Sequence, residues 1–333
     1  MFHRYYRYSE PSKLLSRAIC TTLENLNYFP GLDRIRIVPL NLQLTGVPEP
    51  WKGTRMAIIS DLHAHYFGKD QIKLKEAMES IRPDLILVAG DWIRINYEEQ
   101  DRMSILSAAK ALASVAPVYS NYGNHEIRAR GLTLMQQELS EAGICFLLNE
   151  TVSLQRDNTQ ILMTGFTTPY VYYHGKDKER AGRDMESMGT QWSDAMKNLS
   201  FSDSLPPLTD AVDASKTADI KCISCTAAAS EAASFSAADS LLISRENTFR
   251  IAIAHRPELL PLYASLGPDL VITGHAHGGL MKLGPVRVLA PDQGLFPKMA
   301  EGIRTEDKTT MVISEGLGGP RVGIRPQILV LEL

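Results

Sequence analysis

The stretch Gly274-His275-Ala276-His277-Gly278-Gly279 follows the apolar run Asp269-Leu-Val-Ile-Thr273, which has the pattern of a buried β-strand. A turn at the end of such a strand can aim both imidazole rings into one cleft, because no long side chain has to be ordered. A lone H-x-H motif is equally compatible with an ordinary surface loop. The rest of the chain therefore has to decide between a functional turn and a surface loop.

Composition limits the class of protein. The chain has 333 residues, 44% of them hydrophobic and 22% charged, so it is globular and can bury a large core. A formal net charge of −3 gives no sign of a basic nucleic-acid footprint, so no nucleic-acid partner is expected. Four cysteines do not make a disulfide framework at this length, which favours a reducing compartment. No apolar run approaches the ~20 residues of a membrane span, and the N-terminus lacks a secretory signal, so a cytoplasmic location is expected.

Residues 1–34 form an N-terminal arm that precedes the first predicted strand. Its first half interleaves basic with aromatic side chains, which can lie at the headgroups of an anionic membrane surface and make the protein peripheral to the inner membrane. A solvated, frayed arm is the alternative. The side chains concerned are Arg4, Arg7, Lys13 and Arg17 with Phe2, Tyr5, Tyr6 and Tyr8.

Four more apolar runs end on residues that can bind a metal. Ligand sites in open α/β sheets lie beyond the carboxyl ends of the strands, so such positions are meaningful. The runs are 56–60 before Asp61 and His63, 84–89 before Asp91, 117–121 before Asn124 and His125, and 248–254 before His255.

Helical patterns alternate with these strands. Asp70 is expected to cap a helix that runs to Ile81, and Asp101 a helix that runs to about Val115. Strand–helix–strand alternation argues for an α/β fold with parallel pairing. Further helices are predicted over 132–142 and 257–265, and further strands over 35–44, 144–148, 152–155, 160–166, 286–290, 310–314 and 328–333.

Residues 167–244 differ in character from the domain predicted over 35–166 and 245–333. They contain few apolar periods, and a charged section is followed by Ser/Ala-rich sequence, so an insertion forming a lid beside the site is expected. An unstructured tether is the alternative. Its charged side chains, His174, Lys176, Lys178 and Arg180, fit a solvated run better than a phosphate contact. Cys222 and Cys225 have C-x-x-C spacing without a second pair, so no zinc site is expected there.

Five of the eight histidines stand at the five strand ends. Mixed Asp, His and Asn ligands suit Mn²⁺, Fe or Zn²⁺ better than Ca²⁺. Seven ligands are too many for one ion, but they fit two ions ~3.5–4 Å apart that share a carboxylate, as used for phosphoryl displacement. The candidate ligands are Asp61, His63, Asp91, Asn124, His255, His275 and His277.

These motifs also carry a family resemblance. The series Asp61-x-His63, Gly90-Asp91, Gly123-Asn124-His125-Glu126, His255 and Gly274-His275-x-His277 resembles the calcineurin-like metallophosphoesterases. The resemblance covers residues 35–333 apart from the insertion, and implies a four-layer α/β/β/α sandwich of two mixed sheets flanked by helices. The segments 51–61 and 315–329 are similar to a bacterial phosphodiesterase-like branch that includes a UDP-2,3-diacylglucosamine pyrophosphohydrolase of lipid A synthesis.

The resemblance also implies a role for each residue. The first metal would be held by Asp61, His63 and His277, and the second by Asn124, His255 and His275. Asp91 would bridge the two metals. His125 would be the catalytic residue that protonates the leaving oxygen. Glu126 stands where the family commonly has Asp, and its longer carboxylate can still orient His125. The turn 274–279 would thus tie both halves of the site, with Gly278 and Gly279 leaving room for a phosphate.

The function implied is a dinuclear phosphohydrolase that uses a metal-bridging hydroxide, with Mn²⁺ favoured and Fe or Zn²⁺ as alternatives. The basic-aromatic arm and the insertion favour a nucleotide-activated glycolipid, UDP-2,3-diacylglucosamine, cleaved at its pyrophosphate. The alternatives are a general or cyclic-nucleotide phosphodiesterase and a catalytically silent scaffold. A protein phosphatase is disfavoured, because Gly90-Asp91-Trp-Ile-Arg94 is not followed by the expected Asp-Arg-Gly. His65 is expected to line the cleft rather than to bind metal.

Overall fold

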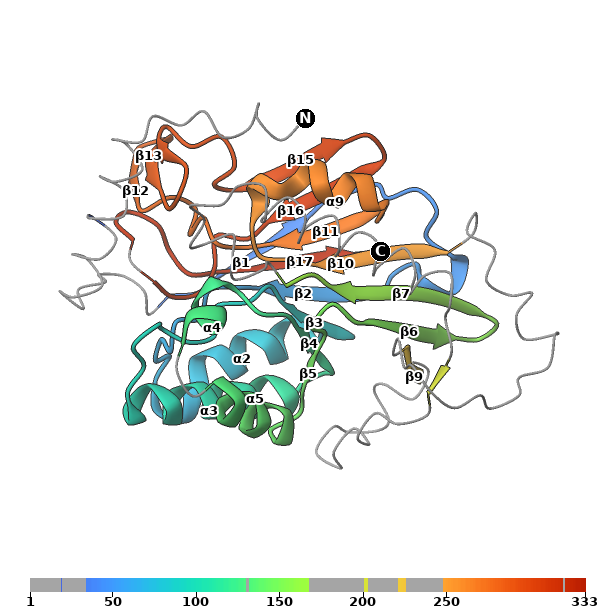
Figure 1. The fold of residues 1–333 in the computed structure, drawn as a ribbon, viewed down its shortest axis with the longest axis horizontal. Helices are drawn as coiled ribbons and strands as arrows, with labels where there is room; N and C mark the ends of the chain where they lie inside the picture. Colours follow the sequence, from blue (N-terminus) through green and yellow to red (C-terminus); the bar gives the residue numbers. More distant parts are fainter. Residues whose placement is uncertain are drawn as a thin grey trace.

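Two β-sheets packed face to face form the centre of the molecule, and helices cover both outer faces (Figure 1). The computed structural model describes residues 34–129, 132–167, 248–319 and 321–333, together with residue 19 and the strands at 201–202 and 221–225. The predicted four-layer α/β/β/α architecture is confirmed. The arm over 1–34 lies almost wholly outside the described residues, as do the charged run at 174–180 and most of the insertion.

The first sheet delivers three of the predicted strand ends to one edge. Its strands run in the order β1-β17-β2-β3-β4-β5, and every neighbouring pair is parallel except β17 with β2. The carboxyl ends of β2, β3 and β4 therefore meet at the same edge. The strands are β1 (Arg36–Leu40), β2 (Arg55–Ile59), β3 (Leu85–Val88), β4 (Val118–Ser120), β5 (Ile144–Phe146) and β17 (Gln327–Glu332).

The second sheet supplies the other two strand ends. Its order is β15-β16-β11-β10-β7-β6-β9-β8, with a parallel centre from β16 to β7 and antiparallel pairs on either side. Two strands, β8 (Phe201–Ser202) and β9 (Lys221–Cys225), come from the predicted insertion, and β9 contains the C-x-x-C spacing. The others are β6 (Thr151–Arg156), β7 (Thr159–Gly165), β10 (Phe249–Ile253), β11 (Leu270–Thr273), β15 (Gly302–Glu306) and β16 (Thr309–Ile313).

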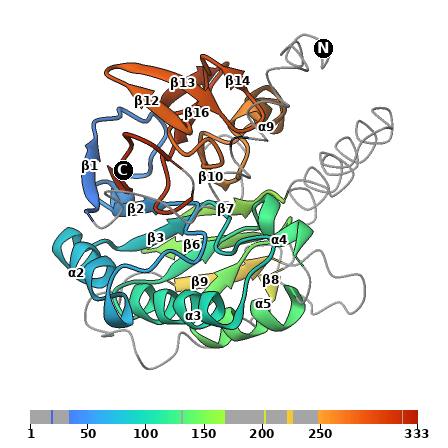
Figure 2. The same cartoon turned by 90° about the vertical axis from the view of Figure 1, so that its left-hand side faces the viewer.

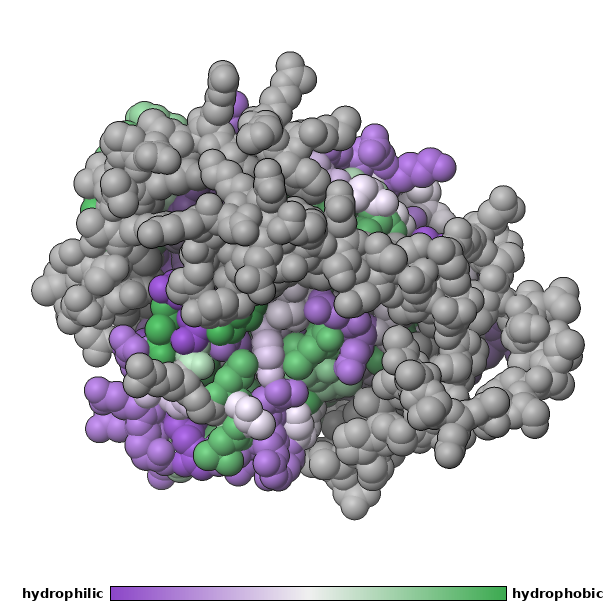
Figure 3. All heavy atoms as spheres, in the orientation of Figure 1, coloured by the Kyte–Doolittle hydropathy of each residue, from purple (hydrophilic) through white to green (hydrophobic). Residues whose placement is uncertain are grey.

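Apolar side chains fill the three spaces between the four layers. Ile58 and Leu87 of the first sheet pack with Ile251 and Ile272 of the second in the central cluster. β3 and β11 are buried at every position, because both faces of these parallel strands are covered by other layers. The helices α2 (Ile72–Ile81), α3 (Glu99–Ala113) and α5 (Leu132–Glu141) cover the first sheet, and α9 (Leu260–Leu266) covers the second (Figure 2). The described surface over the first helical layer is mainly hydrophilic, with separate apolar side chains (Figure 3).

Two predicted helix caps are wrong. Asp70 has a φ of 53° inside the short 3-10 turn η3 (Lys69–Gln71), and the N-cap of α2 is the next residue, Gln71. Asp101 is not the N-cap of α3 but its third residue, where it accepts a hydrogen bond from the backbone N–H of Glu98 at 3.2 Å. An acidic residue at that position completes a capping box, so the sequence pattern alone admits both registers.

A third, three-stranded sheet follows directly after the turn at 274–279. It consists of β12 (Met281–Leu283), β13 (Val286–Ala290) and β14 (Gly294–Leu295), of which only β13 was predicted. The short helix α4 (Asn124–Arg128), which follows β4, was also not predicted. Within the described residues, no helix is both long and apolar enough to cross a membrane.

Candidate active site and metal centre

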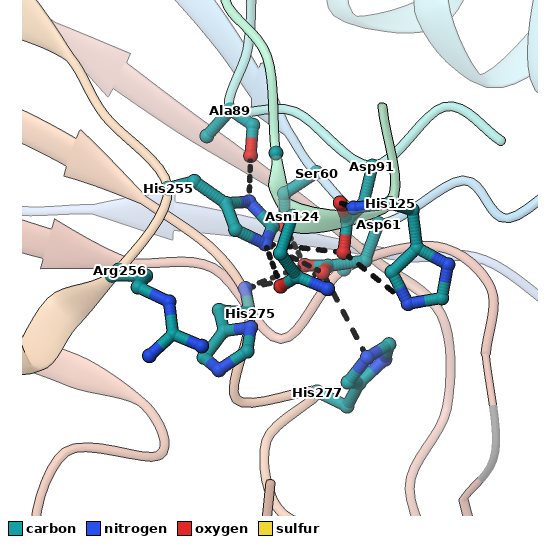
Figure 4. A network of polar contacts seen from close by, with 12 residues as sticks. Ser60, Asp61, Ala89, Asp91, Asn124, His125, His255, Arg256, His275 and His277 are labelled. Carbon is teal, nitrogen blue, oxygen red and sulfur yellow. Dashed lines mark hydrogen bonds and ion pairs between the residues drawn. The ribbon is translucent and has the colours of Figure 1, made fainter. Parts of the chain in front are cut away.

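All five predicted strand ends meet at one edge of the sandwich, where their polar side chains face a common centre (Figure 4). β2, β3 and β4 approach from the first sheet, and β10 and β11 from the second. The structure brings together all eight residues singled out in the sequence, and each of the metal-ligand candidates is at most 6% exposed. They are Asp61, His63, Asp91, Asn124, His125, His255, His275 and His277.

The backbone at this edge is strained. Five of the candidate ligands have positive φ angles: Asp61 at 49°, His63 at 48°, Asp91 at 57°, His275 at 69° and His277 at 53°. Residues other than glycine rarely adopt this left-handed region, and each instance costs ~1–3 kcal/mol. The strain arises because the chain turns sharply after each of these strands. The turn directs the ligand side chains into the centre rather than along the sheet.

The carboxylates of Asp61 and Asp91 join these strand ends. Asp61 accepts a hydrogen bond from the backbone N–H of His275, at 3.0 and 3.1 Å from its two oxygens, and this contact links the two sheets. The hydroxyl of Ser60 also donates to Asp61 at 2.5 Å. Asp91 accepts from the backbone N–H of His125 at 2.8 Å through Oδ1. Oδ2 of Asp91 is buried and has no hydrogen-bond partner among the described residues.

Backbone carbonyl groups fix the orientation of three of the histidine rings. A carbonyl oxygen can only accept, so each of these rings carries its proton on Nδ1 and, when neutral, presents a lone pair on Nε2. The contacts are His63 Nδ1 to Ile93 O at 3.2 Å, His255 Nδ1 to Ala89 O at 2.6 Å and His277 Nδ1 to Gly318 O at 3.3 Å.

The fourth ring, His275, is held the other way round. Its Nε2 lies 3.3 Å from Oδ2 of Asp292, which leaves Nδ1 for the centre. Asp292 in turn contacts Arg256, whose Nη2 is 2.5 Å from the same oxygen and whose side chain is buried. Neither Asp292 nor Arg256 was predicted from the sequence. The signals available were the Pro-Asp-Gln-Gly turn at 291–294 and the position of Arg256 directly after His255.

Asp61, His63 and His277 form the first group of ligand atoms. The Nε2 atoms of His63 and His277 lie 3.3 Å apart. Oδ1 of Asp61 is 3.8 Å from Nε2 of His277 and 3.9 Å from Nε2 of His63. Burial, together with the nearby His125, lowers the pKa of His63 well below its usual range, and burial and His63 do the same for the pKa of His277. A cation between two neutral rings with facing lone pairs would stabilise them, so this group fits a divalent metal.

Asp91, His255 and His275 form a second group, with ligand atoms within 4.8 Å of one another. Nε2 of His255 lies 3.1 Å from Oδ2 of Asp91 and 3.2 Å from Oδ1 of Asn124. The same Asp91 oxygen is 3.8 Å from Nε2 of His63, which belongs to the first group. Asp91 therefore stands between the two groups, where a carboxylate that bridges two ions would be.

The electrostatics of the second group also suit a cation. Burial would raise the pKa of Asp91, but the rings of His255, His125 and His63 outweigh burial and lower that pKa well below its usual range. Burial likewise opposes protonation of His255, yet the carboxylates of Asp91 and Asp61 raise the pKa of His255 to about 9. Without metal, a proton on His255 balances the carboxylates. A divalent ion would replace that proton, so that metal binding would release it.

His125 lies at the rim of the centre, at the start of α4. Its side chain is 11% exposed, its Nε2 is 3.9 Å from Oδ2 of Asp91, and its ring meets that of His63 edge-on at 4.4 Å. This position suits a proton donor to a group bound beside Asp91. The same distances also allow His125 to join His63 and Asp91 as a ligand. His65, by contrast, packs against the ring of Phe67 and belongs to none of the three groups found among the described residues.

The structure shows what Glu126 and the two glycines of the turn contact. Glu126 uses its two oxygens mainly to accept the backbone N–H groups of Asp91, Ile93 and Gly123, at 2.9, 3.1 and 2.8 Å, so it clasps the loops after β3 and β4 together. Burial and then Asp91 raise the pKa of this carboxyl to about 7.

At Gly278 and Gly279 the protein itself fills the space that a side chain would occupy. A Cβ at Gly278 would lie 2.9 Å from the side chain of Glu315, and one at Gly279 would lie 2.9 Å from the carbonyl oxygen of Leu289. These glycines allow the turn to pack tightly against the protein itself.

Comparisons with known proteins identify the family. The family model of the calcineurin-like phosphoesterases matches residues 54–279, which include all five strand ends. Phosphodiesterase YaeI of Escherichia coli (strain K12) is 22% identical over 258 residues, which cover 76% of this chain and 71% of that protein.

Solved structures resemble the chain more distantly. Phosphopantetheinyl hydrolase (PptH) from Mycobacterium tuberculosis is 14% identical with a TM-score of 0.35, and the match covers 78% of this chain and 89% of that one. TT1561 of Thermus thermophilus is 9% identical with a TM-score of 0.39, covering 79% and 90% of the respective chains. The family assignment rests on the model that spans residues 54–279. The chain belongs to the calcineurin-like phosphoesterase family and is a metal-dependent phosphoester hydrolase.

Proposed function

We propose that this chain hydrolyses phosphoric diester or pyrophosphate bonds with two divalent ions at the described centre. The observation that carries the proposal is the position of Asp91, whose Oδ2 lies within 3.1 Å of His255 and 3.8 Å of His63 and so faces both groups of ligands. One ion would be held by Asp61, His63 and His277, the other by Asn124, His255 and His275, with Asp91 shared by both. Two ions at such a centre supply Lewis-acid polarisation of phosphoryl oxygens and lower the pKa of a water toward neutrality.

The chain's own residues position the reaction and move its proton. The carboxylates of Asp61 and Asp91 are held by backbone N–H groups, so the ligands are in place before a substrate arrives. Nε2 of His125 would hold a proton for the leaving oxygen, and general acid catalysis of this kind contributes ~10²–10⁴-fold to a rate. His125 is more exposed than Asp91, 11% against 1%, so a leaving group beside it would lie on the solvent side of the buried ligands.

Mn²⁺ is the metal that we propose first. The donors are imidazole nitrogens, carboxylates and one amide oxygen, and no cysteine joins the groups found in the described part of the chain. Such a mixed, hard-to-borderline donor set suits Mn²⁺, with Fe or Zn²⁺ as alternatives.

For the substrate, we propose a nucleotide-activated glycolipid, UDP-2,3-diacylglucosamine, cleaved at its pyrophosphate to UMP and lipid X. In support, the three-stranded sheet next to the second group exposes large apolar side chains: Leu283 is 62% exposed and Val286 47%, and Phe296, directly after β14, is 65% exposed. This sheet adjoins the centre, since Asp292 lies in the turn between β13 and β14 and contacts His275. An apolar surface beside a phosphohydrolase centre suits a substrate with acyl chains. The basic-aromatic arm and the insertion support the same substrate from sequence.

A general or cyclic-nucleotide phosphodiesterase is the second candidate, favoured by the name of the Escherichia coli relative. A catalytically silent scaffold is disfavoured, because all the candidate ligands and His125 are present and gathered. The test is a Mn²⁺-dependent turnover panel with UDP-2,3-diacylglucosamine, bis-p-nitrophenyl phosphate and cyclic nucleotides. The glycolipid is expected to have the highest kcat/KM; activity on the other two with none on the glycolipid would contradict this choice.

We also propose that the arm over residues 1–34 brings the cytoplasmic protein to the inner membrane. Co-sedimentation of the full-length chain, but not of a Δ1–17 variant, with anionic liposomes is the expected result. If both forms remain in the supernatant, the arm has no such role.

A further inference from the structure

The glycine-rich turn Gly316-Leu-Gly-Gly319, which leads from β16 towards β17, lies directly against the first group of ligands. The backbone N–H of Leu317 donates to Ser60 O at 2.9 Å, and that of Gly318 donates to Asp61 O at 2.6 Å. The turn is therefore attached to the end of β2 at the point where Asp61 enters the centre.

The glycines of this turn are required by its contact with the ligand rings. A Cβ at Gly319 would lie 2.3 Å from Cε1 of His277 and 2.9 Å from Cδ2 of His63. One at Gly318 would lie 2.0 Å from the carbonyl oxygen of Leu62. Because no side chain fits, the turn forms a close-packed wall behind His277 and His63.

Arg321 holds this wall from the other side. Its Nη1 donates to Gly316 O at 3.1 Å, and its Nη2 donates to Gly318 O and lies 3.5 Å from Nδ1 of His277. The residue is 1% exposed, and in the described part of the chain no ion pair joins it to a carboxylate and no partner reaches its Nε. Burying an arginine without a direct ion pair costs several kcal/mol, so stability alone does not account for it.

The carbonyl of Gly318 connects Arg321 to the metal centre. This one oxygen accepts both from Arg321 Nη2 and from Nδ1 of His277. The carbonyl lies nearer to Nδ1 of His277, at 3.3 Å, than Nη2 of Arg321 does, at 3.5 Å, and accepting from Nδ1 places the ring proton there. Nε2 then faces Nε2 of His63, 3.3 Å away. Groups that hold a ligand histidine in this way commonly change metal affinity by about 10- to 100-fold when they are removed.

We propose that Arg321 is a positioning residue for the first metal, acting through the Gly318 carbonyl on the ring of His277. The inference rests on the proposed function, because it takes His277 to be a metal ligand. An arginine is needed because its planar fork reaches the carbonyls of Gly316 and Gly318 at once, whereas a lysine offers a single ammonium group. The C-terminal tail would thereby control the affinity of a site whose ligands come from the other strands.

The test uses the full-length chain, stripped of metal, and Mn²⁺ alone as the probe, with no substrate. Equilibrium dialysis gives the number of ions bound and the Kd of each, and thermal unfolding gives the Tm. The variants are Arg321→Met and Arg321→Lys. The matched control is Arg156→Met, because Arg156 also ties a loop, donating to Pro50 O at 3.0 Å and Thr54 Oγ1 at 2.7 Å, but lies over Trp51 away from the centre.

Wild type is expected to bind two Mn²⁺ ions. Arg321→Met should weaken one of them about 10- to 100-fold, and Arg321→Lys should recover part of that loss. Arg156→Met should lower the Tm while both Kd values stay as in wild type. Added to His277→Ala, Arg321→Met should cause no further loss of affinity, whereas added to His275→Ala it should cause its full loss.

The inference is overturned if Arg321→Met or Arg321→Lys lowers the Tm and yet binds two ions with wild-type Kd values. It is also overturned if the losses from Arg321→Met and His277→Ala simply add. The use of Arg321→Lys guards against a methionine variant that does not fold. Failure of the proposed function is distinguishable, because in that case wild type itself binds no Mn²⁺.

Discussion

The Nε2 atoms of His63 and His277 face each other at 3.3 Å although 214 positions separate the two residues in sequence. Each ring donates from Nδ1 to a backbone carbonyl, so neither Nε2 carries a proton when the ring is neutral. Burial lowers the pKa of both rings, which disfavours a proton between them. The fold therefore holds two lone pairs together in a position that a metal cation would stabilise.

Metal removal should consequently destabilise the whole domain. An ion present at 100 times its Kd contributes about 2.7 kcal/mol to the free energy of unfolding, so chelation with EDTA should lower the Tm by several degrees. Adding Mn²⁺ back should restore it. A Tm that is the same with EDTA and with excess Mn²⁺ would show that the folded chain does not bind the ion.

Substitutions of Asp91 and of His125 should differ in their effect on the number of bound metal ions. Asp91→Asn should bind at least one ion fewer and lose activity, because Oδ2 of Asp91 faces ligands of both groups. His125→Asn should keep both ions while kcat falls about 10²- to 10⁴-fold. His65→Asn is the control, expected to keep both ions and its turnover. Loss of an ion in His125→Asn would instead make His125 a ligand.

The close approach of Gly319 to the histidine rings can be tested against a matched glycine. Gly319 and Gly46 have nearly equal φ angles, +85° and +83°, but a Cβ at Gly46 meets nothing within 4 Å. Gly46→Ala should therefore cost only the left-handed penalty of about 1–2 kcal/mol in unfolding free energy. Gly319→Ala should cost more and should also weaken Mn²⁺ binding. Equal effects of the two substitutions on Mn²⁺ affinity would argue against the packed wall.

Asp292 should matter to the second metal through the ring of His275. Replacing it with Asn removes the charge 3.3 Å from Nε2 of His275, and we expect Mn²⁺ affinity at one site to fall about 10- to 100-fold. Asp307→Asn is the control, since Asp307 has a φ of 53°, against 54° for Asp292, and is exposed in the turn between β15 and β16. If the two variants bind Mn²⁺ alike, Asp292 does not support His275.

The sequence predicted where the candidate ligands lie because they follow strand ends. A buried strand is a short apolar run, and the residue after it must turn at the sheet edge, so Asp61, Asp91 and His255 could be placed from local pattern alone. The alternation of strands and helices predicted an α/β fold with parallel strands, whereas the four layers were implied by the family resemblance. The roles assigned to individual ligands rest on the resemblance and remain predictions.

What the sequence did not show depends on contacts between distant segments. Arg321 lies 44 positions from His277, and Asp292 lies 17 positions from His275, with no periodicity that connects them. Gly278 and Gly279 were interpreted as space for a substrate, but the atoms next to them come from elsewhere in the sequence, from Leu289 in β13 and from Glu315, which follows β16. The helix cap at Asp101 failed for a different reason, since an acidic residue suits either the cap or the third helical position. Asp70 failed because it has a left-handed φ within the 3-10 turn that precedes α2.

The central claim is that one chain binds two divalent ions and needs them to hydrolyse a phosphodiester. The most direct measurement is a Mn²⁺ titration of metal-free protein in which bound ions and hydrolysis of bis-p-nitrophenyl phosphate are followed together. Turnover is expected to be absent without metal and to reach its maximum as the second ion binds. Hydrolysis by the metal-free protein, or a plateau of activity at one ion per chain, would contradict the claim.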